Sequence, residues 1–370
     1  MFKTYVSNVP AGTGNNYIIE KGQTVKLRAR AYLRPNVYGK FTWRFYFSNT
    51  VDSTFADGKA AYRNKPGGNW RINYASVAVA PDSGDDNGAE VLGKASPICN
   101  VTDITFDGSS AKNVSPHERF WSDPVTFRVD EGSYLVWEWE IEGDGIPFTP
   151  DSQVPTFCDW GGGWKFTTDC PFPALFGCDR KVKKTIAFLG DSITQGCATT
   201  INRYEMWAAK ISFALGSDYA VWNLGLGYGR GSDCAADGSW LHKAKQCDIA
   251  VLTFGVNDLE SGAYLRGRSD TAEEFLETEE TLIRLLKEAG VEVILGTVPP
   301  FSFQPAQCGE WRKVNRAIPE LAKKHGLRLY DIERSLDADP NLGNIYTYGA
   351  HPNADGGTVA ANAFMEMWNQ

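Results

Sequence analysis

The residues with the clearest chemical potential lie in the C-terminal half, where a Gly-Asp-Ser segment (190–192) follows the apolar run 185–189. A serine just past a buried strand, at the start of a helix, presents its hydroxyl beside backbone N–H groups and a positive helix terminus. These groups can stabilise an oxyanion, so Ser192 is a candidate nucleophile. The simpler interpretation is that Asp191 or Ser192 merely caps the helix.

Two further segments carry polar side chains that could serve such a serine. The chain has four histidines, and His351 is the one that we expect on a loop in the C-terminal half, ahead of a helix. It is therefore the best general base for Ser192. Asn257, in a Gly-Val-Asn-Asp segment after another apolar run, can donate side-chain N–H groups to an oxyanion. Taken alone, this segment is more typical of a turn or a helix cap.

A glycine-rich segment, residues 223–231, begins with Asn223 and has a glycine at every second position from 225 onward. Glycine lets the backbone approach a ligand closely and aim its N–H groups at it. A nucleotide-binding loop is the competing interpretation, but Gly-x-Gly-x-x-Gly spacing and a Gly-Lys-Ser/Thr sequence are both missing. The eight cysteines include no Cys-x-x-Cys pair, which argues against a zinc or thioredoxin-type site. We predict no cofactor and no metal.

Strand–helix alternation from residue 181 onward would position these segments. A capping-box signature, Thr271 with Glu274 three residues on, marks the start of one helix. Alternation of this kind over 181–370 predicts a doubly wound α/β domain, in which the chemical segments meet at the carboxyl ends of parallel strands. The expected strands are 185–189, 219–223, 248–254, 291–297 and 327–331, and the expected helices are 202–215, 235–245, 272–289, 306–325 and 356–368.

The first half of the chain has a different pattern, in which polar and apolar residues alternate. In residues 24–31, 41–47 and 135–141 every second side chain is apolar, as in half-buried antiparallel strands, and turn-forming clusters separate the runs. We therefore predict an all-β domain over residues 1–180, a β-sandwich of jelly-roll type. Its last part, from about residue 143, is rich in glycine and proline and predicts a long linker.

Bulk properties exclude several classes of partner. The 370-residue chain has a formal net charge of −8 at pH 7, which argues against nucleic acid. No apolar run is long enough to span a bilayer, so we expect no membrane partner. Residues 1–7 lack the apolar core of a signal peptide. If Met1 is the natural start, we expect a cytoplasmic protein, whereas a longer chain with a leader would be secreted.

Taken in order, Gly-Asp-Ser-Ile, the glycine-rich segment, Gly-Val-Asn-Asp and His-Pro-Asn resemble the SGNH (GDSL) hydrolase superfamily over about residues 184–370. The resemblance implies a flavodoxin-like α/β/α fold and ester hydrolysis through an acyl-enzyme. It implies that Ser192 is the nucleophile and His351 the base. The oxyanion hole would consist of the Ser192 N–H, a glycine N–H, for which we favour Gly227, and the Asn257 side chain.

The glycine of the hole depends on the register of the glycine-rich segment. Counted from Asn223, the family's glycine falls on or beside Tyr228. Of the glycines next to that position, Gly227 is the first candidate and Gly229 the second.

The chain also departs from the family pattern three residues before the histidine, where the family has Asp and this sequence has Tyr348. His351 would then be oriented by a carboxylate from elsewhere or by a backbone carbonyl, or would act with Ser192 as a dyad. Loss of an orienting carboxylate weakens a base without abolishing catalysis, because the oxyanion hole supplies much of the stabilisation.

A β-sandwich followed by such a domain is similar to two-domain carbohydrate esterases that remove acetyl groups from xylan or mannan. This implies a serine esterase whose substrates are acetylated oligosaccharides. Two alternatives stay open: a lipolytic or small-acyl-ester enzyme of the same superfamily, and a catalytically inactive carbohydrate-binding protein. The β domain could carry sugar-binding aromatics, shape the cleft or mediate homo-oligomerisation.

Overall fold

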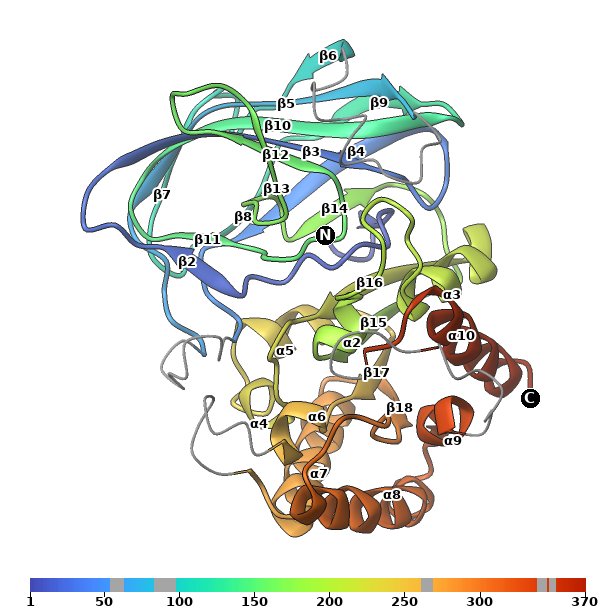
Figure 1. Cartoon of the computed structure of the whole chain (residues 1–370). Helices are drawn as coiled ribbons and strands as arrows, with labels where there is room; N and C mark the ends of the chain where they lie inside the picture. Colours follow the sequence, from blue (N-terminus) through green and yellow to red (C-terminus); the bar gives the residue numbers. More distant parts are fainter. Residues whose placement is uncertain (54–62, 83–97, 261–268, 338–344, 346–350) are drawn as a thin grey trace.

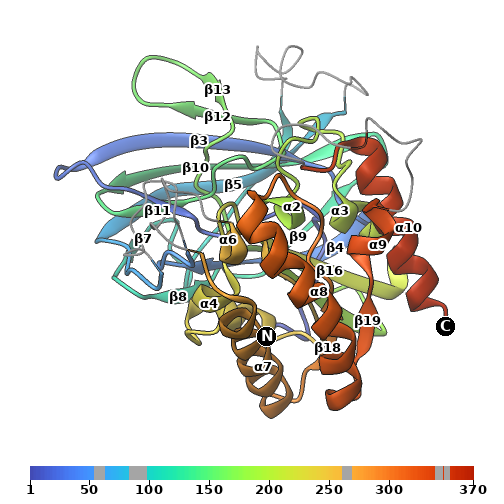
Figure 2. The ribbon, with the colours of Figure 1, turned by 60° about the horizontal axis from the view of Figure 1, so that its bottom comes forward.

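Figure 1 shows the computed structural model of the chain, which describes residues 1–53, 63–82, 98–260, 269–337, 345 and 351–370. A β-rich N-terminal region, called the sandwich below, packs on a C-terminal region of strands and helices, called the α/β domain. The same arrangement is seen after a rotation of 60° (Figure 2).

The sandwich consists of two antiparallel sheets and a small two-stranded ribbon. One sheet has the order β1-β14-β4-β8, with β9 also paired to β4, and the other has the order β13-β12-β3-β10-β5-β6, with β7 also paired to β5. The ribbon pairs β2 with β11. The strands are β1 (Val6–Ser7), β2 (Tyr17–Ile19), β3 (Val25–Leu33), β4 (Gly39–Ser48), β5 (Trp70–Pro81), β6 (Cys99–Asp103), β7 (Lys112–Val114), β8 (Arg119–Trp121), β9 (Val125–Val129), β10 (Ser133–Gly143), β11 (Ile146–Phe148), β12 (Thr156–Asp159), β13 (Lys165–Thr167) and β14 (Leu175–Cys178).

The period-two pattern explains how these sheets pack. On β3, Leu27 and Ala29 point into the core between the sheets, together with Phe45 of β4 and Trp137 of β10. The alternate residue Arg30 lies on the opposite face of β3, where it pairs with Glu138. The predicted all-β domain with antiparallel strands is therefore confirmed, and the jelly-roll subtype stays a prediction.

The stretch from 143 to 180, expected to be an irregular linker, contains four short strands, β11 to β14. Three of them extend the main sheets: β12 pairs with β3, β13 with β12, and β14 with β4. Runs of three or four residues between glycines and prolines are too short to show a period of two, so pairing with longer strands decides their structure.

The α/β domain is built on a parallel five-stranded sheet with the order β16-β15-β17-β18-β19. Numbered along the chain, this is 2-1-3-4-5, the order of flavodoxin-like folds. All five predicted strands are confirmed. Their bounds are β15 (Lys184–Gly190), β16 (Tyr219–Gly225), β17 (Ile249–Thr253), β18 (Glu292–Gly296) and β19 (Arg328–Tyr330).

Helices cover both faces of this sheet, with α3 and α10 packed together on one face. The capping box of α7 is formed as predicted, with the Glu274 N–H donating to Thr271 Oγ1 and the Thr271 N–H to Glu274 Oε2. The helices are α2 (Ser192–Gln195), α3 (Trp207–Leu215), the 3-10 helix η3 (Gly216–Asp218), α4 (Gly231–Cys234), α5 (Ser239–Ala244), α6 (Val256–Leu259), α7 (Ala272–Glu288), α8 (Pro305–His325), α9 (Ile332–Asp337) and α10 (Ala354–Trp368).

Two helices start later than predicted, and contacts with the sandwich account for the first. The helix expected from 202 begins at Trp207, because Asn202 and Tyr204 have positive φ and bind the sandwich instead. Asn202 Nδ2 donates to the Tyr134 hydroxyl at 2.6 Å, and the Arg34 N–H donates to the Tyr204 hydroxyl at 2.9 Å. The helix expected from 235 begins at Ser239.

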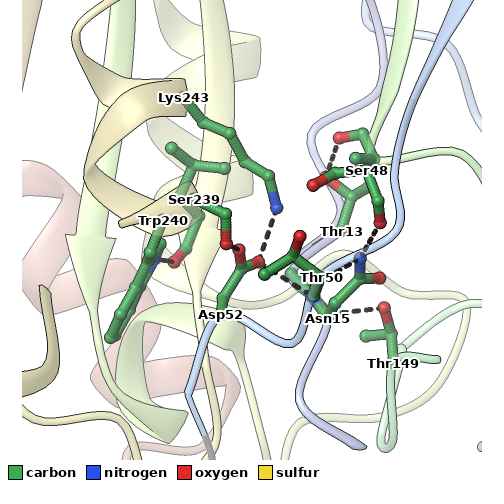
Figure 3. Close-up of polar contacts among 12 residues, drawn as sticks. Thr13, Asn15, Ser48, Thr50, Asp52, Thr149, Ser239, Trp240 and Lys243 are labelled. Atoms are coloured by element: carbon green, nitrogen blue, oxygen red, sulfur yellow. Dashed lines mark hydrogen bonds and ion pairs between the residues drawn. The ribbon is translucent and has the colours of Figure 1, made fainter. Parts of the chain in front are cut away.

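The two regions share a buried polar interface centred on Asp52 of the sandwich (Figure 3). Its carboxylate accepts from the Ser239 hydroxyl and from the Lys243 ammonium, both on α5, and from the Asn15 N–H at 3.0 Å. Asp52 and Lys243 are both fully buried. A buried charge of this kind is stable only while its partner is present, so the ion pair depends on the docking of the two regions.

We predict that Lys243→Met lowers the free energy of unfolding by about 3–5 kcal/mol, because Asp52 is left as an uncompensated buried charge. Denaturant unfolding of the purified protein measures this change. Lys245→Met is the matched control, since Lys245 pairs with Asp237 where both side chains contact solvent, and it should change stability by less than about 1 kcal/mol. Equal effects of the two variants would contradict the prediction.

A second buried charge lies on α7, where Glu279 is 2% exposed and neither carboxyl oxygen has a hydrogen-bond partner in the described structure. Burial, with a smaller contribution from Asp258, raises the pKa of Glu279 to about 8. An acid whose pKa is higher in the folded than in the unfolded state costs stability as the pH rises between the two values.

We therefore expect Glu279→Gln, which cannot ionise, to gain stability over the natural protein progressively from about pH 4.5 to pH 8. The gain should level off above that range at a few kcal/mol. Thermal unfolding across this pH range tests the prediction, with Glu277→Gln, exposed on the same helix, as control. A stability difference that does not vary with pH would show that Glu279 does not ionise in this window.

Candidate active site

Ser192 lies where the sequence predicts it, at the carboxyl edge of the parallel sheet. It is the first residue of α2, directly after β15, and β15 lies between β16 and β17, where the strand order reverses. Asp191 is the N-cap, and its side chain accepts from the Ile193 N–H at 2.8 Å. The capping interpretation is therefore correct for Asp191, whose burial raises its pKa to about 7, while the Ser192 side chain lines a pocket.

Two glycines let α2 sit directly on the strand ends. A Cβ atom on Gly190 would lie 2.1 Å from Thr194 Oγ1, and one on Gly225 would lie 2.2 Å from the Gln195 nitrogen. Neither position has room for a side chain. The helix that carries Ser192 is thus packed against the ends of both β15 and β16.

His351 meets Ser192 across 159 positions of sequence, as predicted. Its Nε2 atom lies 2.8 Å from Ser192 Oγ, within hydrogen-bond distance. The Asn353 side chain caps α10 by accepting from the N–H groups of Asp355 and Gly356, which fixes the chain just after the histidine. The imidazole is 7% exposed, and the Phe301 ring packs edge-on against it at 5.4 Å between centroids. Tyr348, at the position of the family's Asp, lies outside the described residues.

Asn257 also lies at the pocket, and the segment around it holds the glycine loop, residues 225–231. Asn257 Nδ2 donates to the Gly229 carbonyl at 3.1 Å. The neighbouring Asp258 carboxylate accepts from the Gly231 N–H at 3.1 Å, and burial raises its pKa to about 7. Sequence reasoning missed this second role of the segment, because it treated Asn-Asp only as a donor or a turn.

The N–H groups of the two candidate glycines are both used within the described structure. The Gly227 N–H donates to Gln195 Oε1 at 2.6 Å, and the Gly229 N–H donates to the Leu226 carbonyl at 2.8 Å. Neither candidate glycine therefore offers a free N–H to an oxyanion in this structure. The left-handed position of the loop is Tyr228, with φ 60°, which matches the family's glycine when the sequence is counted from Asn223.

A pocket of about 870 Å³ opens over Ser192 and His351, and both regions of the chain line it. The α/β domain contributes Asn257, Tyr228, Glu260 and Phe301 among others. The sandwich contributes Asn16, Tyr17, Phe148, Pro150, Asp151, Thr168 and Asp169. Sequence reasoning named none of these sandwich residues, since a short polar loop gives no periodic signal. The stretch that contains most of them was interpreted only as a linker.

The sandwich wall is polar and acidic, with one aromatic pair. Tyr17 and Phe148, opposite each other on β2 and β11, stack with centroids 5.7 Å apart. Partial burial and the nearby Asp169 raise the pKa of the Asp151 carboxyl. Glu260 adds a third carboxyl group, and among the described lining residues there is no lysine or arginine. The three carboxyl groups of the described wall therefore disfavour anionic ligands.

The described residues were also compared with the patterns of metal sites and membrane-spanning helices. They contain no group of three or more His, Cys, Asp or Glu side chains arranged to bind a metal. None of their helices combines the length and apolarity needed to cross a bilayer. A serine, a histidine at 2.8 Å and an amide side chain in one pocket are groups that can together support nucleophilic catalysis at an acyl group.

Comparison with known proteins places this geometry in a family. Residues 188–359 match the model of the GDSL-like Lipase/Acylhydrolase family. Similar solved structures include a lipolytic protein of the G-D-S-L family from Veillonella parvula, at 21% identity and a TM-score of 0.43, covering 50% of this chain and 98% of its own. Another is an acetylxylan esterase from Geobacillus stearothermophilus, at 17% identity and a TM-score of 0.42, covering 51% and 95%.

No curated protein matches the chain by sequence. The family match spans the end of β15 to the middle of α10, and it includes Ser192, Asn257 and His351. Over residues 188–359, the C-terminal region of this chain therefore resembles the GDSL-like Lipase/Acylhydrolase family.

Proposed function

We propose that the protein is a serine esterase in which Ser192 attacks the carbonyl carbon of an acyl ester. The observation that carries this proposal is the 2.8 Å contact between Ser192 Oγ and His351 Nε2 inside a large pocket. His351 accepts the Ser192 proton as the new C–O bond forms. It then gives that proton to the departing alkoxide, which leaves as an alcohol. The enzyme remains acylated at Ser192. Water, deprotonated by His351, then attacks the acyl carbon. As the acyl–Ser192 bond breaks, His351 returns the proton to Ser192 Oγ and the acid is released.

The oxyanion of each tetrahedral intermediate would lie between the Ser192 N–H and the Asn257 side chain, beside the glycine loop. Ser192 is the first residue of α2, and helix geometry gives its N–H no acceptor within the helix. The contact with the Gly229 carbonyl orients the Asn257 amide, whose nitrogen carries two N–H groups. Gly227 is left out of this hole, because Gln195 holds its N–H.

We further propose that the substrates are acetyl esters of neutral oligosaccharides. The polar side chains of the sandwich wall, Asp151, Thr168 and Asp169, suit the hydroxyl groups of a sugar. The Tyr17 ring beside them offers an aromatic surface of the kind on which sugars pack. A long acyl chain would instead desolvate these polar groups without replacing their hydrogen bonds, which costs free energy.

Ser192→Ala should lower kcat at least about 10³-fold. Without the nucleophile, only the oxyanion hole and substrate binding still accelerate the reaction. The assay is acetate release from acetylated xylo-oligosaccharides, beside hydrolysis of p-nitrophenyl acetate and octanoate. Ser302→Ala, in the same pocket, is the matched control and should keep kcat within a few-fold. Full activity of Ser192→Ala would refute the mechanism. Hydrolysis of octanoate in preference to both acetates would move the substrate class to lipids.

The acidic wall predicts discrimination by charge. A neutral acetylated xylo-oligosaccharide should react with a kcat/KM about tenfold above that of one bearing a uronic acid, as expected for like charges several ångströms apart at intermediate dielectric. The double variant Asp151→Asn, Asp169→Asn should reduce this ratio toward one. Asparagine tolerates the left-handed conformation of Asp151, φ 48°. An unchanged ratio in the double variant would show that these carboxylates do not face the sugar.

A further inference from the structure

The glycine loop beside Ser192 is held by the sandwich as well as by its own domain. Asn16, between the start of the chain and β2, is 1% exposed. Its Nδ2 atom donates to the Gly227 carbonyl at 2.9 Å, across 211 positions of sequence. One face of the Gly227 residue is thus fixed by a side chain from the other region.

The N–H side of the same residue is held through Gln195, at the end of α2. Gln195 Oε1 accepts from the Gly227 N–H at 2.6 Å, while Nε2 donates to the Pro150 carbonyl at 2.7 Å and the Asp151 carbonyl at 3.2 Å. Gln195 is 1% exposed. Its amide therefore connects the helix of the nucleophile, the glycine loop and the sandwich wall in one buried network.

The sandwich segment that carries Asn16 is itself fixed. The Asn16 N–H donates to the Phe148 carbonyl at 3.1 Å, and the Thr149 hydroxyl donates to the Gly14 carbonyl at 2.6 Å. Gly14 lies so close to the glycine loop that a Cβ atom there would be 2.5 Å from Leu226 Cδ1. Asn16 is thus presented to Gly227 by a braced piece of chain.

Burial of the Asn16 side chain costs free energy. Its Oδ1 atom is buried and has no hydrogen-bond partner in the described structure. A buried polar atom without a partner costs about 1–3 kcal/mol. A buried polar group without a partner is rare in folded proteins. The hydrogen bond from Nδ2 to the Gly227 carbonyl explains why an asparagine occupies this position.

We propose that Asn16 and Gln195 are positioning residues that set the glycine loop against Ser192, so that the sandwich is part of the catalytic unit. The inference rests on the proposed esterase function. The loop acts on the oxyanion through Asn257, whose amide donates to the Gly229 carbonyl. A displacement of such a donor by about 1 Å can cost roughly 100-fold in rate. Release of Gly227 on either side would let the loop move by such an amount.

The test compares Asn16→Ala and Gln195→Ala with Asn15→Ala in hydrolysis of p-nitrophenyl acetate. Asn15 is the matched control, a buried asparagine of the same interface whose Nδ2 donates to the Ser48 and Thr50 carbonyls (Figure 3). We expect the first two variants to lose 10- to 100-fold in kcat with KM within about twofold. Asn15→Ala should lower the melting temperature and leave kcat of the folded fraction unchanged.

A second variant separates positioning from stability. In Asn16→Asp, the ionised carboxylate has no proton to donate to the Gly227 carbonyl, whereas the protonated carboxyl group does. The ratio of its kcat to that of the natural protein should therefore rise as the pH falls. The kcat is taken per folded protein at each pH, because protonation of a buried carboxylate also relieves a folding defect. This readout also applies if Asn16→Ala proves too unstable to assay.

The outcomes distinguish this inference from the function on which it rests. If Ser192→Ala is inactive while Asn16→Ala and Gln195→Ala keep natural kcat, the positioning role is overturned and the esterase mechanism stands. A kcat ratio for Asn16→Asp that does not change with pH would also overturn it. If Ser192→Ala remains active, the mechanism falls, and the positioning role falls with it.

Discussion

The close approach of α2 to the ends of β15 and β16 is the constraint on which the site depends. Gly190 and Gly225 leave no space at these strand ends, so the helix rests on backbone. This contact places Ser192 within 2.8 Å of His351 and, one turn later, puts Gln195 beside Gly227. The nucleophile and the loop are therefore positioned by the same packing, and neither can move far without the other.

Buried charges at the interface between the two regions also help to position the site. The Asp52–Lys243 pair is buried. Asp233, which pairs with Arg230 of the glycine loop, also accepts from Ser53 of the sandwich. Buried ion pairs add little to stability on balance, but a pair that is satisfied in one arrangement penalises every other. We infer that these contacts select a single docking of the sandwich on the α/β domain, and so a single shape for the pocket between them.

The sequence predicted those features that a local pattern determines. Apolar runs located all five parallel strands, and the Gly-Asp-Ser and His-Pro segments located a pair that the fold brings together. Where the prediction differs, contacts distant in sequence decide. Residues 202–206 are not helical because Asn202 and Tyr204 bind the sandwich, and the strands within 143–180 exist because longer strands lie beside them. The sandwich residues that line the pocket lie in short polar segments, which have no periodic pattern that a single sequence could reveal.

The glycine loop shows why a composition rule can choose the wrong residue. Positive φ favours glycine, yet the loop has Tyr228 in that conformation and glycine on either side. A non-glycine residue there costs roughly 1–2 kcal/mol. The hydrogen bonds to Gly227 from Asn16 and to Gln195, together with the bond from Asn257 to Gly229, are worth about 1 kcal/mol each. Because contacts from outside the loop hold the residues on both sides of Tyr228, these contacts, and not the preference of residue 228, determine the loop.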